Sequence, residues 1–278
     1  MNRTGGLVGR MDRIGLIAGK GMYPVLICEN LKKNSDTVYT AAFYNETAPV
    51  LKKLSDNIKW FKIGELGSVI EYFRTNQIKK IIMAGLIKHT KIFENIYLDN
   101  TLKNILMSLK DKKADSILGA IADEFVKNGM EIIPVLEILK NNIVKEEIIT
   151  NKIPNSKYLE YINFGFRIAK EISKLDIGQT IVIKEKAIVA VEAMEGTDRC
   201  ILRGGDIAGD DCIIIKVAKF NQDLRFDLPV IGPGTIKKMN KIKSKFLAVE
   251  AYKTIIIDRK ETIDKANKSG ISIIGLKQ

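Results

Sequence analysis

Residues 13–84 alternate the patterns of buried strands and amphipathic helices, and this alternation restricts the fold more than any other feature of the chain. The predicted strands are 13–18, 37–43, 57–62 and 78–84, and the predicted helices between them include one that ends near Lys33 and one at 66–76. Strands that alternate with helices form parallel sheets with crossover helices. The sequence therefore predicts a Rossmann-like parallel-sheet domain, in which ligands bind at the carboxyl ends of the strands.

The first predicted strand runs into a glycine-rich turn, G-K-G-M-Y-P, at residues 19–24. A strand, a glycine-rich turn and a helix with proline near its first position direct free backbone N–H groups at an anion. The turn lacks the third glycine of the dinucleotide fingerprint and the ending of a Walker loop, so an ordinary strand-to-helix turn stays open as an alternative. The fourth strand should end beside this turn. The candidate binding residues at this edge are Gly19, Lys20, Gly21, Met22, Tyr23, Gly85 and Lys88, with His89 as a polar or substrate-contact residue.

A polar stretch at residues 140–154 predicts a linker between two domains. We expect a flexible tail at residues 1–10, the N-terminal Rossmann-like domain at 11–145 and a C-terminal mixed α/β domain at 155–278. In the second domain we expect a helix at 158–173 and strands at 181–184, 187–191, 213–217, 246–249, 254–257 and 271–276. The predicted fold class is therefore α/β in two domains, with a ligand cleft between them.

The stretch K-F-N-Q-D-L-R-F-D-L-P-V-I-G-P-G-T, residues 219–235, follows a buried strand pattern. Asp223, Arg225 and Asp227 alternate with apolar residues, so an extended segment turns all three to one side. Arginine is much rarer than lysine in this chain, and its planar fork binds phosphate or carboxylate through two bonds. An edge strand with a solvated polar face is the alternative interpretation. Thr235 is the predicted N-cap of a helix at 236–243.

A second acidic stretch, E-A-M-E-G-T-D-R, occupies residues 192–199. Glu192, Glu195 and Asp198 with the Gly-Thr turn can assemble a site for a hard cation, because Mg²⁺ prefers oxygen ligands. The same residues fit a helix start with Thr197 or Asp198 as the cap. Both interpretations stay open from the sequence.

The formal net charge of +12 admits nucleic acid, an anionic membrane surface or an anionic substrate as partner. The excess is lysine scattered along the chain, without a dense basic block or interleaved aromatic residues, which argues against nucleic acid. Part of it suits an enzyme that is peripheral to an anionic membrane. No apolar run has the length of a membrane-spanning helix, and no secretory signal is apparent.

His89 is the only histidine of the chain, which excludes metal sites made of several histidines. The cysteines Cys28, Cys200 and Cys212 are odd in number and lack metal-like spacing. We therefore expect reduced thiols and a cytoplasmic protein.

Four motifs together resemble the LpxI-type UDP-2,3-diacylglucosamine pyrophosphatases. They are I-G-L-I-A-G-K-G-M-Y-P near the start, L-D-I-G-Q-T at 175–180, V-E-A-M-E-G-T-D at 191–198 and the stretch at 219–235. The resemblance covers almost all of the chain from Met11 onward. It implies two domains that hold a lipid between them. It also implies metal-dependent cleavage of the pyrophosphate of UDP-2,3-diacylglucosamine in lipid A biosynthesis, giving lipid X and UMP.

The resemblance also implies the site. Asp227 in R-F-D-L-P matches the aspartate on which the family's activity depends. We expect Mg²⁺, or another divalent cation such as Mn²⁺, with Asp227, Asp198 and Glu195 as ligands. The candidate substrate-binding residues of the C-terminal motifs are Gln179, Gly196, Thr197, Arg199, Arg225 and Thr235. The expected partners are the UDP-linked diacylated glucosamine lipid, the inner-membrane surface and a second copy in a homodimer, without nucleic acid.

Two other functions are compatible with parts of the chain. The first is an oxidoreductase with a nucleotide cofactor, suggested by the N-terminal turn. An oxidoreductase of this kind needs an acidic side chain at the end of the second strand to bind the ribose of its cofactor. That strand ends near Phe43, and Glu46 lies just past it. The second is a basic module that binds RNA or an anionic membrane, which ranks third because no RNA-binding motif is present.

Overall fold

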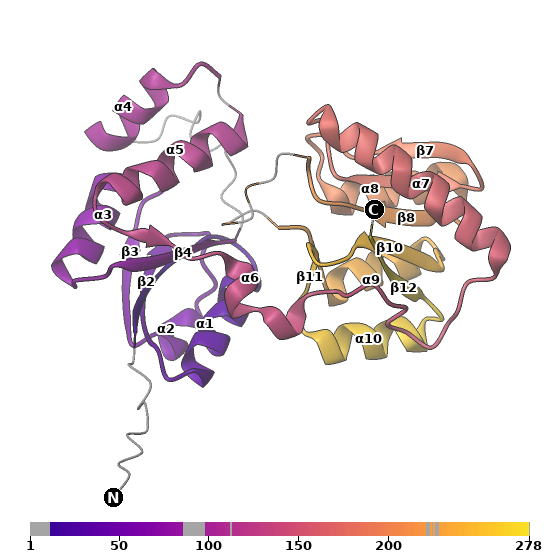
Figure 1. The fold of residues 1–278 in the computed structure, drawn as a ribbon, viewed down its shortest axis with the longest axis horizontal. Helices are drawn as coiled ribbons and strands as arrows, with labels where there is room; N and C mark the ends of the chain where they lie inside the picture. Colours follow the sequence, from indigo (N-terminus) through magenta and orange to yellow (C-terminus); the bar gives the residue numbers. More distant parts are fainter. Residues whose placement is uncertain are drawn as a thin grey trace, which may run out of the picture. The chain divides into compact units, whose positions relative to one another are not determined.

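The computed structural model describes residues 12–85, 98–111, 113–220, 223, 225 and 228–277. The chain forms two compact units, Met1–Ile138 and Leu139–Gln278 (Figure 1), and each is described by itself. The predicted tail at residues 1–10 lies outside the described residues. Within the described ranges, no helix combines the length and the apolar character needed to span a bilayer.

The first unit is built on a parallel sheet in the order β3-β2-β1-β4-β5. Its strands are β1 (Arg13–Ala18), β2 (Thr37–Phe43), β3 (Asn57–Phe61), β4 (Lys80–Ala84) and β5 (Glu131–Ile132). Its helices are α1 (Tyr23–Lys33), α2 (Leu51–Leu54), α3 (Leu66–Thr75), α4 (Asn100–Ser108), α5 (Ala114–Lys127) and α6 (Val135–Ile138). The predicted parallel-sheet domain is confirmed.

The central strands of the first unit, β1 and β4, are largely apolar because helices cover the sheet on both faces. Figure 1 shows α1 and α2 on one face and α3, α4 and α5 on the other. Leu16, Ile81 and Ile82 are each 0% exposed, as expected of central strands that are buried on both sides. The short helices α2 and α6 are not predicted from the sequence, since four residues are too few to display a helical period.

The second unit contains a mixed sheet in the order β12-β10-β8-β6-β7, in which β8, β10 and β12 are parallel and β6 is antiparallel to both of its neighbours. Its strands are β6 (Thr180–Lys184), β7 (Ala187–Val191), β8 (Ile213–Lys216), β10 (Phe246–Glu250) and β12 (Ser272–Leu276). A parallel pair, β9 (Val230–Ile231) and β11 (Ile255–Ile256), lies apart from that sheet. The predicted mixed α/β domain is confirmed.

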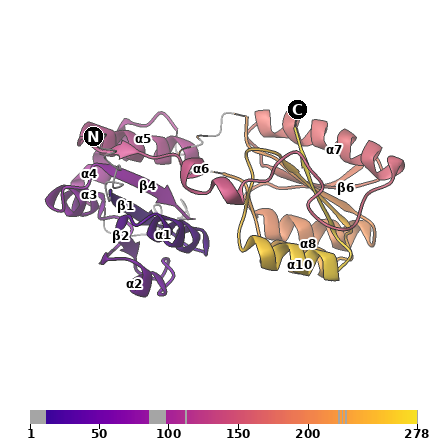
Figure 2. The ribbon, with the colours of Figure 1, turned by 60° about the horizontal axis from the view of Figure 1, so that its bottom comes forward.

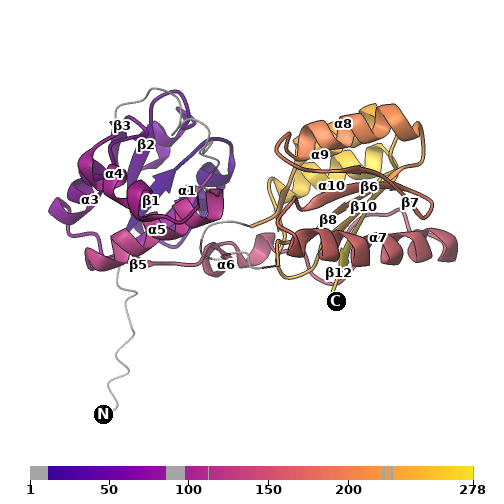
Figure 3. The same ribbon diagram turned by 90° about the horizontal axis from the view of Figure 1, so that it is seen from above.

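Two apolar cores pack against the two faces of this sheet. The helices are η2 (Lys140–Asn142), α7 (Ser156–Lys174), α8 (Thr197–Ala208), α9 (Pro233–Lys241) and α10 (Arg259–Lys268). Figures 2 and 3 show α7 on one face and α8 and α10 on the other. Ile162 and Phe166 of α7 pack with Ile215, and Cys200 of α8 packs with Ile214. Successive residues of β8 therefore face opposite cores.

The whole predicted linker, residues 140–154, lies within the second unit, which begins at Leu139. Ile148 forms an antiparallel bridge with Ile274 of β12, and the N–H of Gly275 donates to the carbonyl of Glu147 at 2.9 Å. A Cβ at Gly275 would lie 1.9 Å from the carbonyl oxygen of Lys145, so this close approach requires glycine. Residues 147–150 therefore cover the outer edge of β12.

Two helices have caps other than those predicted. α9 begins at Pro233, because proline suits the first position of a helix, and Gly232 is its cap. Thr235 lies in the first turn, where its hydroxyl accepts a bond from the N–H of Gly232 at 3.4 Å, so the prediction of Thr235 as the N-cap is wrong. The predicted helix start near Thr197 is confirmed, but the cap of α8 is Gly196, with a φ of 81°, and neither Thr197 nor Asp198.

Candidate active site

The glycine-rich turn of the first unit lies at the carboxyl edge of its sheet. Ala18 at the end of β1 pairs with Ala84 at the end of β4. The N–H of Gly19 donates to the carbonyl of Ala84 at 2.7 Å, and a Cβ at Gly85 would lie 2.8 Å from the carbonyl carbon of Gly19. Gly85 has a φ of 89°, a conformation that favours glycine. The structure therefore brings Gly19 and Gly85 together, as the sequence predicts.

α1 begins directly after this turn. Met22 is its cap and makes no side-chain capping bond to the described residues, while Pro24 occupies the first turn. Tyr23 is buried, and Lys20 and Gly21 are exposed. The first N–H groups of a helix without a side-chain cap can bind an anion. The predicted residues Lys88 and His89 lie outside the described residues.

Three strand ends meet at one edge of the second sheet. Lys216, the last residue of β8, pairs with Thr180, the first residue of β6. Glu192 follows β7, and its N–H donates to the carbonyl of Thr180 at 2.8 Å. Strand alternation places all three side chains on the face that α8 and α9 cover.

Thr197, the first residue of α8, joins these side chains. Its hydroxyl donates to Glu192 Oε1 at 2.9 Å and accepts from Lys216 Nζ at 3.2 Å, and Thr180 Oγ1 lies 3.3 Å away. Lys216 Nζ also donates to the carbonyl of Val230 at 3.0 Å. We call Thr180, Glu192, Thr197 and Lys216 the edge cluster.

Three of the four side chains of the edge cluster are buried, and two of them are charged residues. Glu192 and Lys216 are each 7% exposed, and Thr180 is 0% exposed. Oε2 of Glu192 is buried and has no hydrogen-bond partner among the described residues. Buried polar atoms in folded proteins are almost always bonded. The edge cluster is therefore the strongest candidate for a functional site in the second unit.

The predicted metal ligands Glu195 and Asp198 flank Thr197, and each has a cationic partner. The carboxylate of Glu195 accepts from Arg203, and this bond lowers the pKa of Glu195. Asp198 forms an ion pair with Lys238 of α9 at 2.7 Å. In the part of the chain that the structure describes, no three Asp, Glu, Cys or His side chains gather in a metal-binding group.

Asp227, the predicted catalytic residue and third metal ligand, lies outside the described residues. Glu195 and Asp198 are both bound to cationic side chains of the protein itself. The described residues therefore do not form the predicted Mg²⁺ site by themselves.

Two residues of the stretch at 219–235 form a forked ion pair. Nη2 of Arg225 lies 2.6 Å from Asp223 Oδ2, and Nε lies 2.9 Å from Oδ1. The guanidinium holds the pKa of Asp223 below its ordinary value. The guanidinium of Arg225 thus binds an acid of the same stretch.

The remaining predicted residues are spread over both faces of the sheet. Arg199 is exposed on α8. Strand alternation places Gln179 on the face of α7, opposite Thr180, and its buried Oε1 has no partner among the described residues. The structure thus places Thr197 in the edge cluster and Gly196 directly before it, and separates Gln179 from both.

Comparison with known proteins identifies both halves of the chain. Residues 13–142 match the LpxI N-terminal domain, and residues 145–274 match the LpxI C-terminal domain. The chain belongs to the LpxI family. One relative, the UDP-2,3-diacylglucosamine pyrophosphatase LpxI of Caulobacter vibrioides, is 27% identical over 277 residues, which are 96% of this chain and 98% of the relative.

Two solved structures show distant similarity to this LpxI chain. The biotin carboxylase domain of a thermophilic 2-oxoglutarate carboxylase has a TM-score of 0.28 and 12% identity, and covers 61% of this chain and 34% of its own. The biotin carboxylase subunit of a pyruvate carboxylase has a TM-score of 0.28 and 12% identity, and covers 72% of this chain and 42% of its own. Similarity at this level supports no argument about fold or function.

A second buried network in the LpxI C-terminal domain was not expected from the sequence. Lys170 of α7 and Glu250 at the end of β10 form an ion pair at 2.9 Å, with side chains 7% and 6% exposed. Glu250 Oε2 also accepts from the N–H of Ala218 at 2.9 Å, and Oε1 pairs with Lys253 at 2.8 Å. Lys170 and Glu250 are 80 residues apart, so no local pattern could pair them.

This network should make the fold sensitive to acid. Burial raises the pKa of Glu250, but the bonds from Lys253, Lys170 and Ala218 outweigh it and hold the pKa below its ordinary value of 4.5. A carboxylate with a depressed folded-state pKa stabilises the fold above its unfolded pKa, and this stabilisation is lost as the pH falls through the folded-state value. We expect the melting temperature to fall as the pH drops below 4.5, with a smaller fall for Glu250→Gln. Equal slopes for the two proteins in thermal unfolding would exclude Glu250 as the cause.

The cysteines of the LpxI chain are free and buried, in agreement with the predicted thiols. Burial raises the pKa of Cys200 to about 12. These thiols are therefore packing residues without a nucleophilic role.

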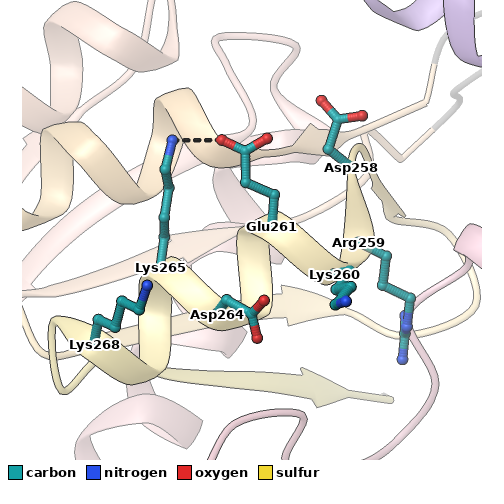
Figure 4. Close-up of a pocket in the computed structure, with 7 residues that line it drawn as sticks. All are labelled: Asp258, Arg259, Lys260, Glu261, Asp264, Lys265 and Lys268. Atoms are coloured by element: carbon teal, nitrogen blue, oxygen red, sulfur yellow. Dashed lines mark ion pairs between the residues drawn. The ribbon is translucent and has the colours of Figure 1, made fainter.

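The surface of α10 carries a hollow of about 550 Å³ that contains no predicted site residue (Figure 4). It is lined by Asp258, Arg259, Lys260, Glu261, Asp264, Lys265 and Lys268. Glu261 and Lys265 form an ion pair across it at 2.6 Å, which is typical of a solvated helix surface.

Proposed function

We propose that this protein hydrolyses the pyrophosphate bond of UDP-2,3-diacylglucosamine and releases lipid X and UMP in lipid A biosynthesis. The match of both halves of the chain to the LpxI domains carries this proposal. The Caulobacter relative, which aligns with nearly the whole chain, is named for that substrate.

The chemistry of the substrate determines what the protein must supply. A pyrophosphate carries negative charge, so its hydrolysis needs charge neutralisation and an aligned water more than a covalent nucleophile. In the proposal, the loop at residues 19–23 offers backbone N–H groups to one phosphate at the start of α1; the N–H of Gly19 is not among them, because it donates to the carbonyl of Ala84. Arg199 and Arg225 are the candidate cations for the phosphates, and Asp227 orients the water.

Dependence on Mg²⁺ or Mn²⁺ is part of the proposal. A bound divalent cation supplies a Lewis acid and a water of lowered pKa. Glu195 and Asp198 already form ion pairs with Arg203 and Lys238. Asp227 is therefore the residue to which the proposal first assigns the metal.

The proposed location follows from the substrate. Its acyl chains anchor it in the membrane, so the enzyme works in the cytoplasm at the inner-membrane surface. The net charge of +12 attracts the protein to anionic head groups. Assembly as a homodimer is also part of the proposal.

Release of UMP from UDP-2,3-diacylglucosamine tests the reaction and its central residue. We expect release with Mg²⁺, loss of release with a chelator, and a fall in turnover of at least about 10²-fold in Asp227→Ala. Asp206→Ala removes an exposed aspartate of α8 and serves as the control, with turnover unchanged. Full activity of Asp227→Ala would remove this residue from the mechanism.

Absence of UMP release by the wild-type protein under any metal would overturn the proposed function. The oxidoreductase hypothesis would then be tested by NAD and NADP, since a ligand that binds the folded state raises the melting temperature.

A further inference from the structure

One oxygen of Glu192 in the edge cluster is unused by the described fold. Glu192 is 7% exposed, and its Oε1 accepts the hydroxyl bond of Thr197 at 2.9 Å. Oε2 is buried and has no hydrogen-bond partner among the described residues. The backbone of Glu192 is fixed by its bond to Thr180 and by close packing of Gly178, where a Cβ would lie 2.0 Å from the carbonyl oxygen of Glu192.

Such an oxygen is unfavourable for folding. A carboxylate only accepts hydrogen bonds, and a buried ionised group that is short of donors destabilises the folded state by several kcal/mol. A neutral glutamine has nearly the same shape without the charge. Residues that lower the stability of the fold are typical of functional sites.

Positively charged groups lie near this carboxylate. The ammonium of Lys216 and Oε1 of Glu192 both contact the hydroxyl of Thr197. Glu192 also lies beside the first residue of α8, and the N-terminus of a helix carries partial positive charge. The edge cluster therefore holds a carboxylate in place while leaving one of its oxygens for another group.

The chemistry of Oε2 restricts what that group can be. An ionised phosphate has no donor and is repelled by a carboxylate. A hydroxyl or a water offers an O–H donor without negative charge. We propose that Glu192 Oε2 accepts a hydrogen bond from an O–H group in the enzyme–substrate complex, which is either the hydrolytic water or a sugar hydroxyl of the substrate. This inference rests on the proposed function.

Each donor gives Glu192 a defined role. With water as the donor, the water oxygen bonds to one phosphorus and the bridging P–O bond breaks, so that the other phosphate leaves as a monoester anion that keeps the bridging oxygen. One proton of the water passes to Glu192 Oε2 and then to solvent. With a sugar hydroxyl as the donor, no proton moves, and Glu192 orients the substrate. Both roles require the charge and the position of this one oxygen.

Glu192→Gln tests the inference, because it keeps the volume and removes the charge. We expect a melting temperature at or above the wild-type value, because glutamine removes the unpaired buried charge. We expect kcat/KM for UMP release to fall by at least about 10²-fold. A fall confined to kcat, with unchanged UMP affinity in calorimetry, identifies the water. A rise in KM and weaker binding of UMP or lipid X identifies a sugar hydroxyl.

The control is Glu171→Gln, which removes an exposed carboxylate of α7 and should change neither activity nor melting temperature. Wild-type kcat and KM in Glu192→Gln would overturn the inference. A loss of activity that only follows a large loss of folded protein would also overturn it, because Glu192 would then serve the fold. If the wild-type protein releases no UMP, the proposed function fails instead, and calorimetry with UMP and lipid X still tests Glu192.

Discussion

Replacement of Lys170 by methionine should lower the free energy of unfolding by about 3–5 kcal/mol. Lys170 and Glu250 are buried on the α7 face of the second sheet, at 7% and 6% side-chain exposure. Removal of one partner leaves the other charge in a medium of low dielectric. Lys170 Nζ also donates to the carbonyl of Ala218 at 3.4 Å, so the chain that leaves β8 loses a contact as well. Denaturant unfolding followed by circular dichroism measures the change.

Two further variants separate this effect from ordinary surface electrostatics. Lys174→Met, one turn later in α7, breaks an exposed pair with Glu171 and should change stability by less than about 1 kcal/mol. The double variant Lys170→Met with Glu250→Leu should recover most of the loss, because an apolar pair of similar volume can replace a buried ion pair. Equal effects of Lys170→Met and Lys174→Met would show that burial does not decide the strength of the pair.

The second large effect is expected from Gly178→Ala, which should destabilise the protein by at least about 3 kcal/mol and abolish UMP release. A Cβ at Gly178 would lie 2.0 Å from the carbonyl oxygen of Glu192 and 2.7 Å from its carbonyl carbon. Both are backbone atoms, so no side-chain rotation can relieve the clash. The shift would also break the 2.8 Å bond from the N–H of Glu192 to Thr180 and move the edge cluster.

Gly119→Ala is the matched control for Gly178→Ala. Gly119 lies within α5, and an added Cβ meets no described atom within 4 Å. Alanine should therefore raise stability there by about 0.5–1 kcal/mol, because glycine is the poorer helix former. A Gly178→Ala protein with the wild-type melting temperature and activity would show that the two strands can separate without harm.

The sequence predicts the N-terminal sheet well because its evidence is local. Each strand is a short apolar run, each long helix has its own period, and the alternation between them implies parallel pairing. The contact between Gly19 and Gly85 follows from that topology, since the carboxyl ends of neighbouring parallel strands share one edge.

The edge cluster is harder to predict because its members come from separate strands. In the sequence alone, Lys216 is only the polar end of a predicted strand, and Glu192 is one of several acidic residues. Their meeting at Thr197 depends on the antiparallel register of β6 with both β7 and β8. The sequence does predict a functional stretch around Thr197, but the residues that it proposes there as metal ligands are Glu195 and Asp198. In the structure their carboxylates bind Arg203 and Lys238.

The helix starts show a second limit of sequence patterns. Thr235 and Thr197 are both good capping residues, yet glycine is the cap of α9 and of α8. In α9 the proline at 233 fixes the first turn two residues before Thr235. In α8 the left-handed backbone of Gly196 leaves Thr197 inside the helix, where its hydroxyl is directed to the edge cluster.

The cover that residues 147–150 provide for β12 determines where this chain can be cut. Ile149 donates to the carbonyl of Ile273 at 2.9 Å, and the hydroxyl of Thr150 accepts from the N–H of Ile273 at 2.9 Å. A C-terminal fragment that starts at residue 155 would expose the backbone of β12 along an apolar edge, a surface that recruits strands from other molecules. A fragment that starts at Leu139 keeps this edge paired and is the one to express when the second unit is studied alone.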